Sequence, residues 1–488
     1  MWLACPAVGQ AKLSVTKTAD SLVDPAALTI DGAFGQAING LSFQQDAVIS
    51  HAGYQYVGYY DGNRRVCIAR RKLPGGDWRM IRFEDYDFQS NDAHNIISIG
   101  ICPRDGTIHV AFDHHGHPLH YRASHKHVAS DPESVEWSPA LFGPVTDELE
   151  TGKPIRITYP RFIQTPDGNL QFCYRRGGSG SGDRMLVDYD GDSGRWSGTR
   201  QIDSGQGLFT DTLGQSNSRC SYPNGYTYGP AGRLHVTWVW REDSQGANHD
   251  LVYVSSEDRG RTWLNNGGQV LAGPPQVNSP GIAVVPISQT LGLMNTHGQA
   301  VDSKGRVHVV VWHCTAESLE AAGSKPGEQR WGPPEARRYH HYWRQTDGRW
   351  NHRQLPGPVG NRPKVFIDSN DNAWVIYATR DPGEKLPDGH LHRRGDLTIA
   401  AATAAANWTD WQIVHTEPGP FVNEILADPC RWATETILSV MVQQSPAQAH
   451  EATALRILDF TVTNVEPGSR QSPGFGIQPG GAARNPES

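Results

Sequence analysis

The sequence lacks the features that mark membrane, nucleic-acid-binding or disulfide-rich proteins. Its 488 residues contain no apolar stretch of 18 residues, so we expect no membrane-spanning helix. The net charge of −7 argues against a nucleic-acid partner. The seven cysteines are scattered, odd in number and without CxxC pairs, so no disulfide framework is expected. Residues 1–10 are apolar but short and have no basic n-region, and therefore make a poor signal peptide.

Glycine, proline and tryptophan are plentiful, with 52, 33 and 15 residues. This composition predicts many short strands joined by tight turns. A tryptophan following a turn recurs, mostly at intervals close to 60 residues, at Trp78, Trp137, Trp196, Trp263, Trp350 and Trp408. A turn leading into an alternating strand recurs with it, at Gly106, Gly168, Gly232, Gly305 and, more weakly, Asn370–Asn372.

A repeat of about 60 residues with several short strands fits propeller blades of four antiparallel strands. We therefore predict an all-β fold, one seven-bladed β-propeller over residues 1–465, closed by strands from both ends of the chain. The segment from Ser256 to Trp263 matches the Asp-box pattern S-x-D-x-G-x-T-W, which is typical of sialidase-like propellers. Residues 317–337 are expected to form a surface loop with a short helix, and residues 466–488 a disordered tail.

Four groups in the first half of the chain suggest a catalytic site: His94, the His114–His115 pair, Tyr159 and Arg175. An arginine that neutralises a carboxylate, with histidine and tyrosine to move protons, suits proton abstraction next to that carboxylate. Each residue alone has an ordinary structural explanation, such as a hydrogen-bonded strand histidine. Equivalent positions on neighbouring blades nevertheless converge on one mouth of the channel, so a shared site is expected.

Several motifs resemble the propeller polysaccharide lyases of the BNR/Asp-box superfamily, the ulvan lyases and related rhamnose–glucuronate lyases. The resemblance covers roughly residues 40–460 and includes spacings of 20 from His94 to His114 and 16 from Tyr159 to Arg175. The motifs are His94-Asn95, Asp113-His114-His115, Pro118-Leu119-His120-Tyr121, Tyr159-Pro160, Tyr174 to Gly180, Tyr222 to Gly225 and Asn248 to Leu251.

This resemblance implies roles for individual residues. Arg175 would neutralise a uronate carboxylate, while Tyr159, lowered in pKa by the arginine, and a histidine would handle the two protons. Spacing favours His114, but alternate strand residues face opposite ways, and a one-residue loop difference would select His115. The substrate-binding residues would be Asn95, Arg176, Arg219 and Tyr222.

A second set of residues predicts a structural zinc site. His249, His297, Cys314 and either His340 or His341, with His341 preferred, offer the imidazole and thiolate ligands of tetrahedral zinc. The resembled family includes members with such a metal. The alternative is that the histidines bond to backbone carbonyls and that Cys314 is simply buried.

The function predicted from these residues is cleavage of a rhamnose–glucuronate linkage by β-elimination, leaving a 4,5-unsaturated uronate. Catalysis would need no cofactor, and the partner would be an acidic polysaccharide met by a secreted or periplasmic monomer. One alternative is a rhamnosidase-type hydrolase on the opposite face, where His51 could act, although hydrolases normally use paired carboxylates. Another is a propeller that binds acidic glycans without cleaving them.

Overall fold

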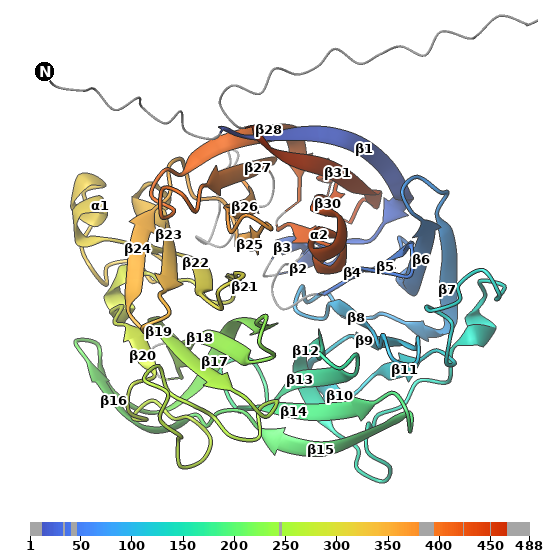
Figure 1. The fold of residues 1–488 in the computed structure, drawn as a ribbon, viewed down its shortest axis with the longest axis horizontal. Coiled ribbons are helices and arrows are strands. Elements are labelled where there is room, and N and C mark those ends of the chain that lie inside the picture. The colour runs from blue at the N-terminus through green and yellow to red at the C-terminus, as the bar shows by residue number, and fades with distance from the viewer. Residues whose placement is uncertain are drawn as a thin grey trace, which may run out of the picture.

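Seven small antiparallel sheets stand in a ring around a central axis, as Figure 1 shows. The computed structural model describes residues 12–32, 35–40, 46–243, 246–379, 395–422, 424–448 and 450–465. The predicted seven-bladed all-β propeller is confirmed. The tail predicted for residues 466–488 lies outside the described residues.

The first three blades come from the first 201 residues. Blade 1 consists of β4 (Val48–His51), β5 (Tyr54–Tyr60), β6 (Arg65–Lys72) and β7 (Arg79–Asp87). Blade 2 consists of β8 (Ile97–Ile101), β9 (Ile108–Phe112) and β11 (Tyr121–Ala123). Blade 3 consists of β10 (His115–Pro118), β12 (Arg156–Gln164), β13 (Leu170–Arg176), β14 (Asp183–Asp190) and β15 (Arg195–Gln201). β10 leaves blade 2 and pairs with β12, so it joins two blades.

Blades 4 to 6 follow in chain order. Blade 4 consists of β16 (Gln206–Asp211), β17 (Gly214–Tyr228), β18 (Leu234–Glu242), β19 (Asn248–Ser256) and β20 (Ala283–Val285). Blade 5 consists of β21 (Gly298–Val301), β22 (Val307–Cys314), β23 (Arg337–Arg344) and β24 (Trp350–Gln354). Blade 6 consists of β25 (Lys364–Ile367), β26 (Ala373–Ala378), β27 (Gly395–Ala402) and β28 (Gln412–Phe421).

Blade 7 closes the ring with strands from both ends of the chain, as the sequence predicts. β29 (Leu426–Ala427), β30 (Ile437–Gln443) and β31 (Thr453–Val465) come from the C-terminal part, and β1 (Lys12–Ala27) completes the sheet against β31. A separate hairpin joins β2 (Thr29–Gly32) to β3 (Gly35–Ala37).

Helix is scarce in the described part of the chain. α1 (Ala316–Ala321) falls at the edge of the segment where the sequence predicts a short helix, and α2 (Pro429–Glu435) joins β29 to β30. Short 3₁₀ turns occupy Pro139–Leu141, Gln289–Leu291 and Pro334–Ala336. No helix among the described residues is both long and apolar enough to span a membrane.

The recurrent glycine turns all lie on one face of the ring. Gly106, Gly168, Gly232 and Gly305 join the innermost strand of a blade to the second strand. In blade 7 that connection is α2, so α2 belongs to the same face. Because the strands are antiparallel, the start of each inner strand and the end of the second strand meet at the opposite face, which we call the site face.

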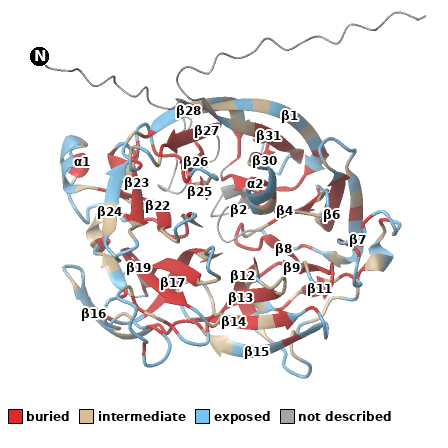
Figure 2. Ribbon diagram, viewed as in Figure 1, coloured by how far each residue is buried: buried red, intermediate tan, exposed pale blue. Residues whose placement is uncertain are grey.

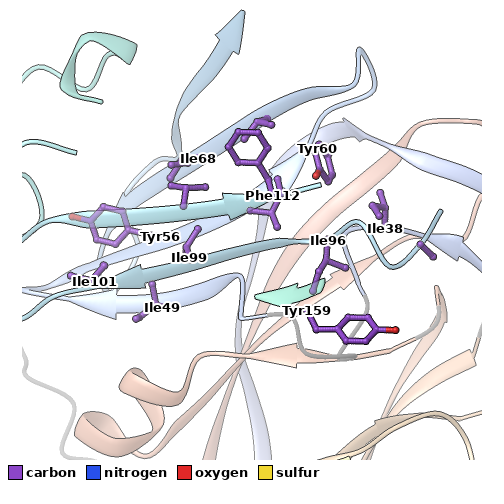
Figure 3. Close-up of a cluster of buried hydrophobic side chains, with 14 of the residues drawn as sticks. Ile38, Ile49, Tyr56, Tyr60, Ile68, Ile96, Ile99, Ile101, Phe112 and Tyr159 are labelled. Carbon is purple, nitrogen blue, oxygen red and sulfur yellow. The ribbon is translucent and has the colours of Figure 1, made fainter. Parts of the chain in front are cut away.

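The core lies between the blades and not along the axis. Figure 2 shows buried inner strands and a more exposed rim formed by outer strands such as β15, β24 and β28. One apolar cluster extends over blades 1 to 5 and includes Ile68, Ile99 and Phe112 of blades 1 and 2 and Tyr159 of blade 3 (Figure 3). The axis itself holds a cavity of about 570 Å³, lined by inner-strand residues such as Gln164, and by Trp432 of α2.

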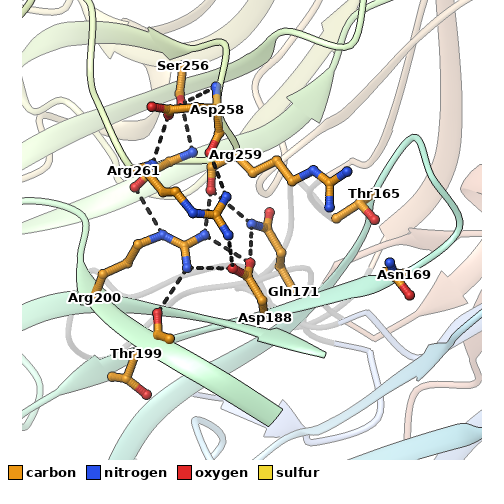
Figure 4. A network of polar contacts seen from close by, with 12 residues as sticks. Thr165, Asn169, Gln171, Asp188, Thr199, Arg200, Ser256, Asp258, Arg259 and Arg261 are labelled. Atoms are coloured by element: carbon orange, nitrogen blue, oxygen red, sulfur yellow. Dashed lines mark hydrogen bonds and ion pairs between the residues drawn. The ribbon is translucent and has the colours of Figure 1, made fainter. Parts of the chain in front are cut away.

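The Asp-box segment links blade 4 to blade 3. Within the turn, Asp258 accepts hydrogen bonds from the backbone N–H and the hydroxyl of Thr262, at 2.8 and 2.7 Å. Outside it, Arg261 pairs with Asp188 of β14 at 2.9 Å, and Arg200 of β15 pairs with the same carboxylate (Figure 4). This motif therefore has a structural role in the described chain.

Candidate active site

The predicted catalytic residues come together at the site face of blades 2, 3 and 4. His94 precedes β8, His115 opens β10, and Tyr159 lies on β12. Arg175 is near the end of β13, and Tyr222 lies on β17. The rings of His94 and His115 are each 6.0 Å from that of Tyr159, whose ring is 5.9 Å from Tyr222. Corresponding ends of neighbouring blades thus form one group of side chains.

Two imidazoles in this group share one carboxylate. Nδ1 of His94 lies 2.5 Å from Oδ1 of Asp92, and Nδ1 of His115 lies 2.6 Å from Oδ2. The two rings stack with centroids 4.3 Å apart. Within the described residues, Asp92, His94 and His115 are the one group of three whose ligand atoms lie close enough to hold a metal ion.

The histidine pair is resolved in favour of His115, which corrects the preference for His114 drawn from spacing. His114 is fully buried, and its Nε2 accepts a hydrogen bond from the backbone N–H of His120 at 2.8 Å. The chain turns at Asp113, which has a left-handed φ of 62°, before β10 begins at His115. The turn ends β9 and lets the second histidine, not the first, reach Asp92.

Tyr159 reaches the site through a bulge in β12. Thr158 pairs with Arg175 and Arg161 with Cys173, so two residues of β12 stand opposite one of β13. Tyr159 has φ of 58°, a conformation that costs a residue with a side chain about 1–2 kcal/mol. Pro160 fits here because it has no N–H to leave unpaired. The bulge directs the phenol away from the regular alternation of the strand.

Arg175 is a buried cation next to both phenols. Its side chain is 2% exposed, and its Cζ lies 5.0 Å from the ring of Tyr159 and 4.3 Å from that of Tyr222. The guanidinium donates to the backbone carbonyls of Ser221 and Gly178. Within the described residues it forms no ion pair, although a buried charge normally has one. Such a guanidinium can bind the carboxylate of a ligand.

A serine connects the two phenols. Oγ of Ser179, in the loop between β13 and β14, lies 3.4 Å from the hydroxyl of Tyr159 and 3.4 Å from that of Tyr222. Nη1 of Arg241, near the end of β18, donates to the Tyr222 hydroxyl at 3.2 Å. Two phenol oxygens are therefore held near one point.

The two phenols differ in acidity, and the difference reverses the expectation for Tyr159. Burial raises the pKa of Tyr159 well above its usual value, and Tyr222 adds to this shift, while Arg175 only partly offsets it. Burial also acts on Tyr222, but the charges of Arg175 and Arg241 outweigh it and lower that pKa. The tyrosine made more acidic by arginine is thus Tyr222, not Tyr159.

Of the predicted substrate-binding residues, Tyr222 lies in the site and the other three have structural contacts. Asn95 is fully buried and donates to Asp113. Arg176 faces the opposite side of β13 from Arg175, 4.0 Å from Asp183. Arg219 is fully buried against Glu242 at 2.6 Å. We therefore correct the assignment of Asn95, Arg176 and Arg219 to the substrate site.

Three polar residues of the site were missed in the sequence. Asp92 is two residues before His94, and Ser179 lies in the glycine-rich loop after Arg175. Arg241 had a usable signal, because it occupies the end of the second strand of blade 4 as Arg175 does in blade 3. Comparing equivalent strand ends between blades would have found it.

The predicted zinc ligands are not brought together, so that set is corrected. Among described residues, no three of His249, His297, Cys314 and His341 have ligand atoms within 4.8 Å of one another. His249 is held by Glu242 and Asp250 at 2.9 and 3.0 Å. The backbone N–H of Trp312 donates a hydrogen bond to Nε2 of His297. The ring of His341 is hydrogen-bonded to that of His308, and the ring of His340 to that of His352. Each imidazole has a protein partner of its own.

His51, the residue suggested for a hydrolase site, lies far from this group in the fold. It ends β4 beside the turn into β5, and therefore belongs to the face opposite the site face. Burial lowers its pKa, and within the described residues it forms no ion pair.

Comparison with known proteins gives a family match and several similar proteins. A model of the BNR repeat-containing family matches residues 54–357. An ulvan lyase (long isoform) from Alteromonas sp. is 25% identical over 329 residues, which cover 55% of this chain and 32% of the relative. A long-isoform ulvan lyase from Pseudoalteromonas sp. is 24% identical with the same coverage. The matched part thus spans about a third of these relatives.

Solved structures with the same fold include two polysaccharide lyases. The lyase Uly1 has a TM-score of 0.71 and 17% identity, covering 91% of this chain and 99% of that chain. A PL25 ulvan lyase bound to -[GlcA(1-4)Rha3S]- has a TM-score of 0.60 and 13% identity, covering 91% and 96%. At these identities the likeness establishes the propeller architecture.

Proposed function

The chain belongs to the BNR repeat-containing family, and on that premise we propose that it is a polysaccharide lyase that cleaves next to a uronic acid by β-elimination. The observation that carries the proposal is Arg175, a buried guanidinium without an ion-pair partner among the described residues, beside two phenols and two imidazoles. The similarity to ulvan lyases supports the same conclusion.

Arg175 would bind the uronate carboxylate through two N–H donors. The C5 proton of a uronate is weakly acidic while the carboxylate keeps its full negative charge. Pairing with a guanidinium stabilises the enolate-like charge that builds up as the proton leaves. Because the arginine is buried, this pairing acts in a low dielectric and is stronger than it would be in water.

The two phenols would then divide the proton transfers according to their pKa values. Tyr222, in its phenolate form, takes the C5 proton; the C5–H electron pair forms the C4=C5 double bond, and the C4–O bond breaks. Tyr159, kept protonated by burial, gives its proton to the departing oxygen. In a glucuronate the C5 hydrogen and the C4 oxygen are gauche, so neighbouring phenols on one side can serve both.

The cycle closes when a proton returns from Tyr222 to Tyr159. Ser179 lies 3.4 Å from both hydroxyls and offers a route for that proton. His94 and His115 would face the same sugar and hydrogen-bond to its carboxylate or leaving oxygen. His115 is the alternative base, because its Nε2 has no hydrogen-bond partner among the described residues.

For the substrate we propose a rhamnose–glucuronate glycan. The support is the similarity to ulvan lyases, one of whose structures holds -[GlcA(1-4)Rha3S]-. Since a polymer of this kind does not cross a membrane intact, we also propose that the protein acts outside the cytoplasm. A monomer would suffice, because every proposed catalytic group comes from one chain.

The test uses a pair of neighbouring arginines. Incubation with a rhamnose–glucuronate glycan should raise the ultraviolet absorbance of the unsaturated uronate. Arg175→Gln should lower kcat/KM by about 10²–10³-fold. Arg176→Gln, one residue along the same strand and exposed, should leave it within about twofold. Reducing ends released without new absorbance would show a hydrolase, and binding without either product would show a binding propeller.

A further inference from the structure

We infer that Asp92 is a positioning residue that fixes both His94 and His115 in the tautomer with the proton on Nδ1, so that both Nε2 atoms are presented away from the carboxylate. The inference rests on the proposed function, in which the two imidazoles face the sugar. Asp92 itself would not touch the substrate and would act only through the two rings.

The carboxylate is held in a rigid turn. The backbone N–H of Asp92 donates to Oγ of Ser90 at 3.0 Å, and Oδ1 accepts from the backbone N–H of His94 at 3.0 Å. Oδ1 also meets Nδ1 of His94 at 2.5 Å, which leaves Oδ2 for Nδ1 of His115 at 2.6 Å. One side chain therefore sets the orientation of rings that come from two different blades.

These contacts fix the tautomers because an ionised carboxylate only accepts hydrogen bonds. Each Nδ1 must carry a proton to donate to it, so each Nε2 holds the lone pair when its ring is neutral. Nε2 of His115 is buried and has no hydrogen-bond partner among the described residues, as expected for an atom that meets a ligand. An imidazole with its Nδ1–H on a carboxylate is also a stronger base.

Asp92 also supplies a negative charge to the pair formed by His94 and His115. Although burial works against ionisation, the hydrogen bonds from His115 and His94 keep the pKa of Asp92 well below its usual range. Burial lowers the pKa of His94, and the charges of His115 and Arg362 add to this, while Asp92 opposes the shift. The carboxylate therefore favours protonation of His94, which burial and Arg362 disfavour.

The shared carboxylate also limits that protonation to one ring at a time. The ring centroids are 4.3 Å apart, so two imidazolium ions would repel each other across the stack. One carboxylate can balance one of them.

The test is Asp92→Asn, which keeps the shape but replaces an acceptor with an N–H donor. One ring must then turn its lone pair toward the amide and lose its Nδ1 proton. We expect kcat to fall between about 10-fold and 10⁴-fold, the range for carboxylates that orient an imidazole. KM should stay within about threefold. Asp92→Glu should recover part of kcat, and Asp347→Asn, on an exposed turn, should match the parent protein.

A second arm separates positioning from a direct or merely structural role. In a His94→Ala/His115→Ala background, Asp92→Asn should cause no further loss of kcat, because the residues through which it acts are gone. A further loss of kcat in that background, or an unchanged kcat in the single variant, would overturn the inference.

A spectroscopic measurement keeps the test independent of the proposed activity. Histidine ¹⁵N chemical shifts of the full-length protein should show Nδ1-protonated rings for His94 and His115, and Asp92→Asn should change the tautomer of at least one. If the parent protein makes no unsaturated product but the shifts behave in this way, the proposed function fails and the positioning role stands. Nε2-protonated rings in the parent protein would refute the positioning role.

Discussion

Tyr159 and Tyr222 are residues of the same type, but their surroundings shift their pKa values in opposite directions. Both are buried, but Tyr222 lies closer to Arg175 and also contacts Arg241. Positive charge stabilises the phenolate of Tyr222 and lowers its pKa, whereas burial dominates at Tyr159 and raises its pKa. Two groups whose pKa values are shifted in opposite directions are suited to act as base and acid.

This assignment predicts distinct behaviour for two conservative variants. Tyr159→Phe and Tyr222→Phe should each lower kcat by about 10²–10⁴-fold while the fold stays intact. In the parent protein the rate should rise with pH toward the lowered pKa of Tyr222, and this rise should disappear in Tyr222→Phe. The measurement is kcat against pH with circular dichroism as the control for folding. If Tyr222→Phe keeps its activity and His115→Ala loses it, the base is His115.

Ser179 gives a prediction about proton return. Removing its hydroxyl should slow the return of the proton from Tyr222 to Tyr159, because that hydroxyl contacts both phenols. Ser179→Ala is therefore expected to lower kcat by about 10-fold with little change in KM. Ser181→Ala in the same loop is the matched control. Equal rates in both variants would remove Ser179 from the proton path.

The choice between His114 and His115 shows what the sequence could not supply at the residue scale. Strand alternation predicts that just one of them enters the site. Which one depends on the left-handed φ of 62° at Asp113, and aspartate adopts that conformation only sometimes. The sequence also does not indicate the positive φ of Tyr159, because residues with a side chain adopt that conformation only rarely. His115 and Tyr159 were named from the sequence, but the directions of their side chains depended on two irregular backbone positions.

At the scale of elements, the hairpin formed by β16 and the start of β17 depends on one buried ion pair. Arg219 pairs with Glu242 and donates to the backbone carbonyls of Gly205, Gln206, Gly207 and Ser216. Phe209 of the hairpin stacks on His249, which also contacts Glu242. This arginine therefore holds the hairpin against blade 4 instead of facing the substrate.

Arg219→Ala should consequently be a stability variant. It leaves Glu242 buried without its main partner, which costs about 3–5 kcal/mol of unfolding free energy. Urea denaturation followed by tryptophan fluorescence should show the loss. At a temperature where the variant is folded, KM should change little. A several-fold rise in KM at unchanged stability would instead restore the substrate-binding role.

The sequence predicted elements better than it predicted side-chain clusters between elements. Glycine turns such as Gly106 and Gly168 mark the first turn of blades 2 to 5 because the glycines adopt positive φ, a local requirement. The zinc set failed because it combined residues by type over long separations. His249 and His341 already have carboxylate and imidazole partners that no spacing in the sequence reveals.

At the scale of the whole molecule, the ring is closed by the two ends of the described chain. β1 pairs with β31 from Lys12 opposite Val465 to Ala27 opposite Thr453, with several register shifts. β1 forms the outer edge of this sheet, so blade 7 combines one strand from the start of the described chain with three from its end. This closure also makes the seven blades depend on one another, because blade 7 cannot form until both ends of the chain meet.

Buried histidines distributed around the ring predict how the stability of the whole molecule depends on pH. Burial lowers the pKa of His109 to about 3, of His235 and His313 to about 4, and of His340 to about 2. These residues belong to blades 2, 4 and 5. In the unfolded chain each would titrate near 6.5, so below that pH the unfolded state binds more protons than the folded state.

Stability should therefore be full above about pH 6.5 and should fall as the pH drops toward 4. Each of these histidines contributes up to about 1.4 kcal/mol per pH unit in that window. His249 acts in the opposite direction, since its contacts with Asp250 and Glu242 outweigh burial and raise its pKa, but it is a single group. The measurement is the thermal midpoint between pH 7.5 and 5. His313→Gln should flatten the decline, whereas His125→Gln, at an exposed position, should not. A midpoint that stays constant down to pH 5 would mean that these imidazoles are protonated in the folded ring.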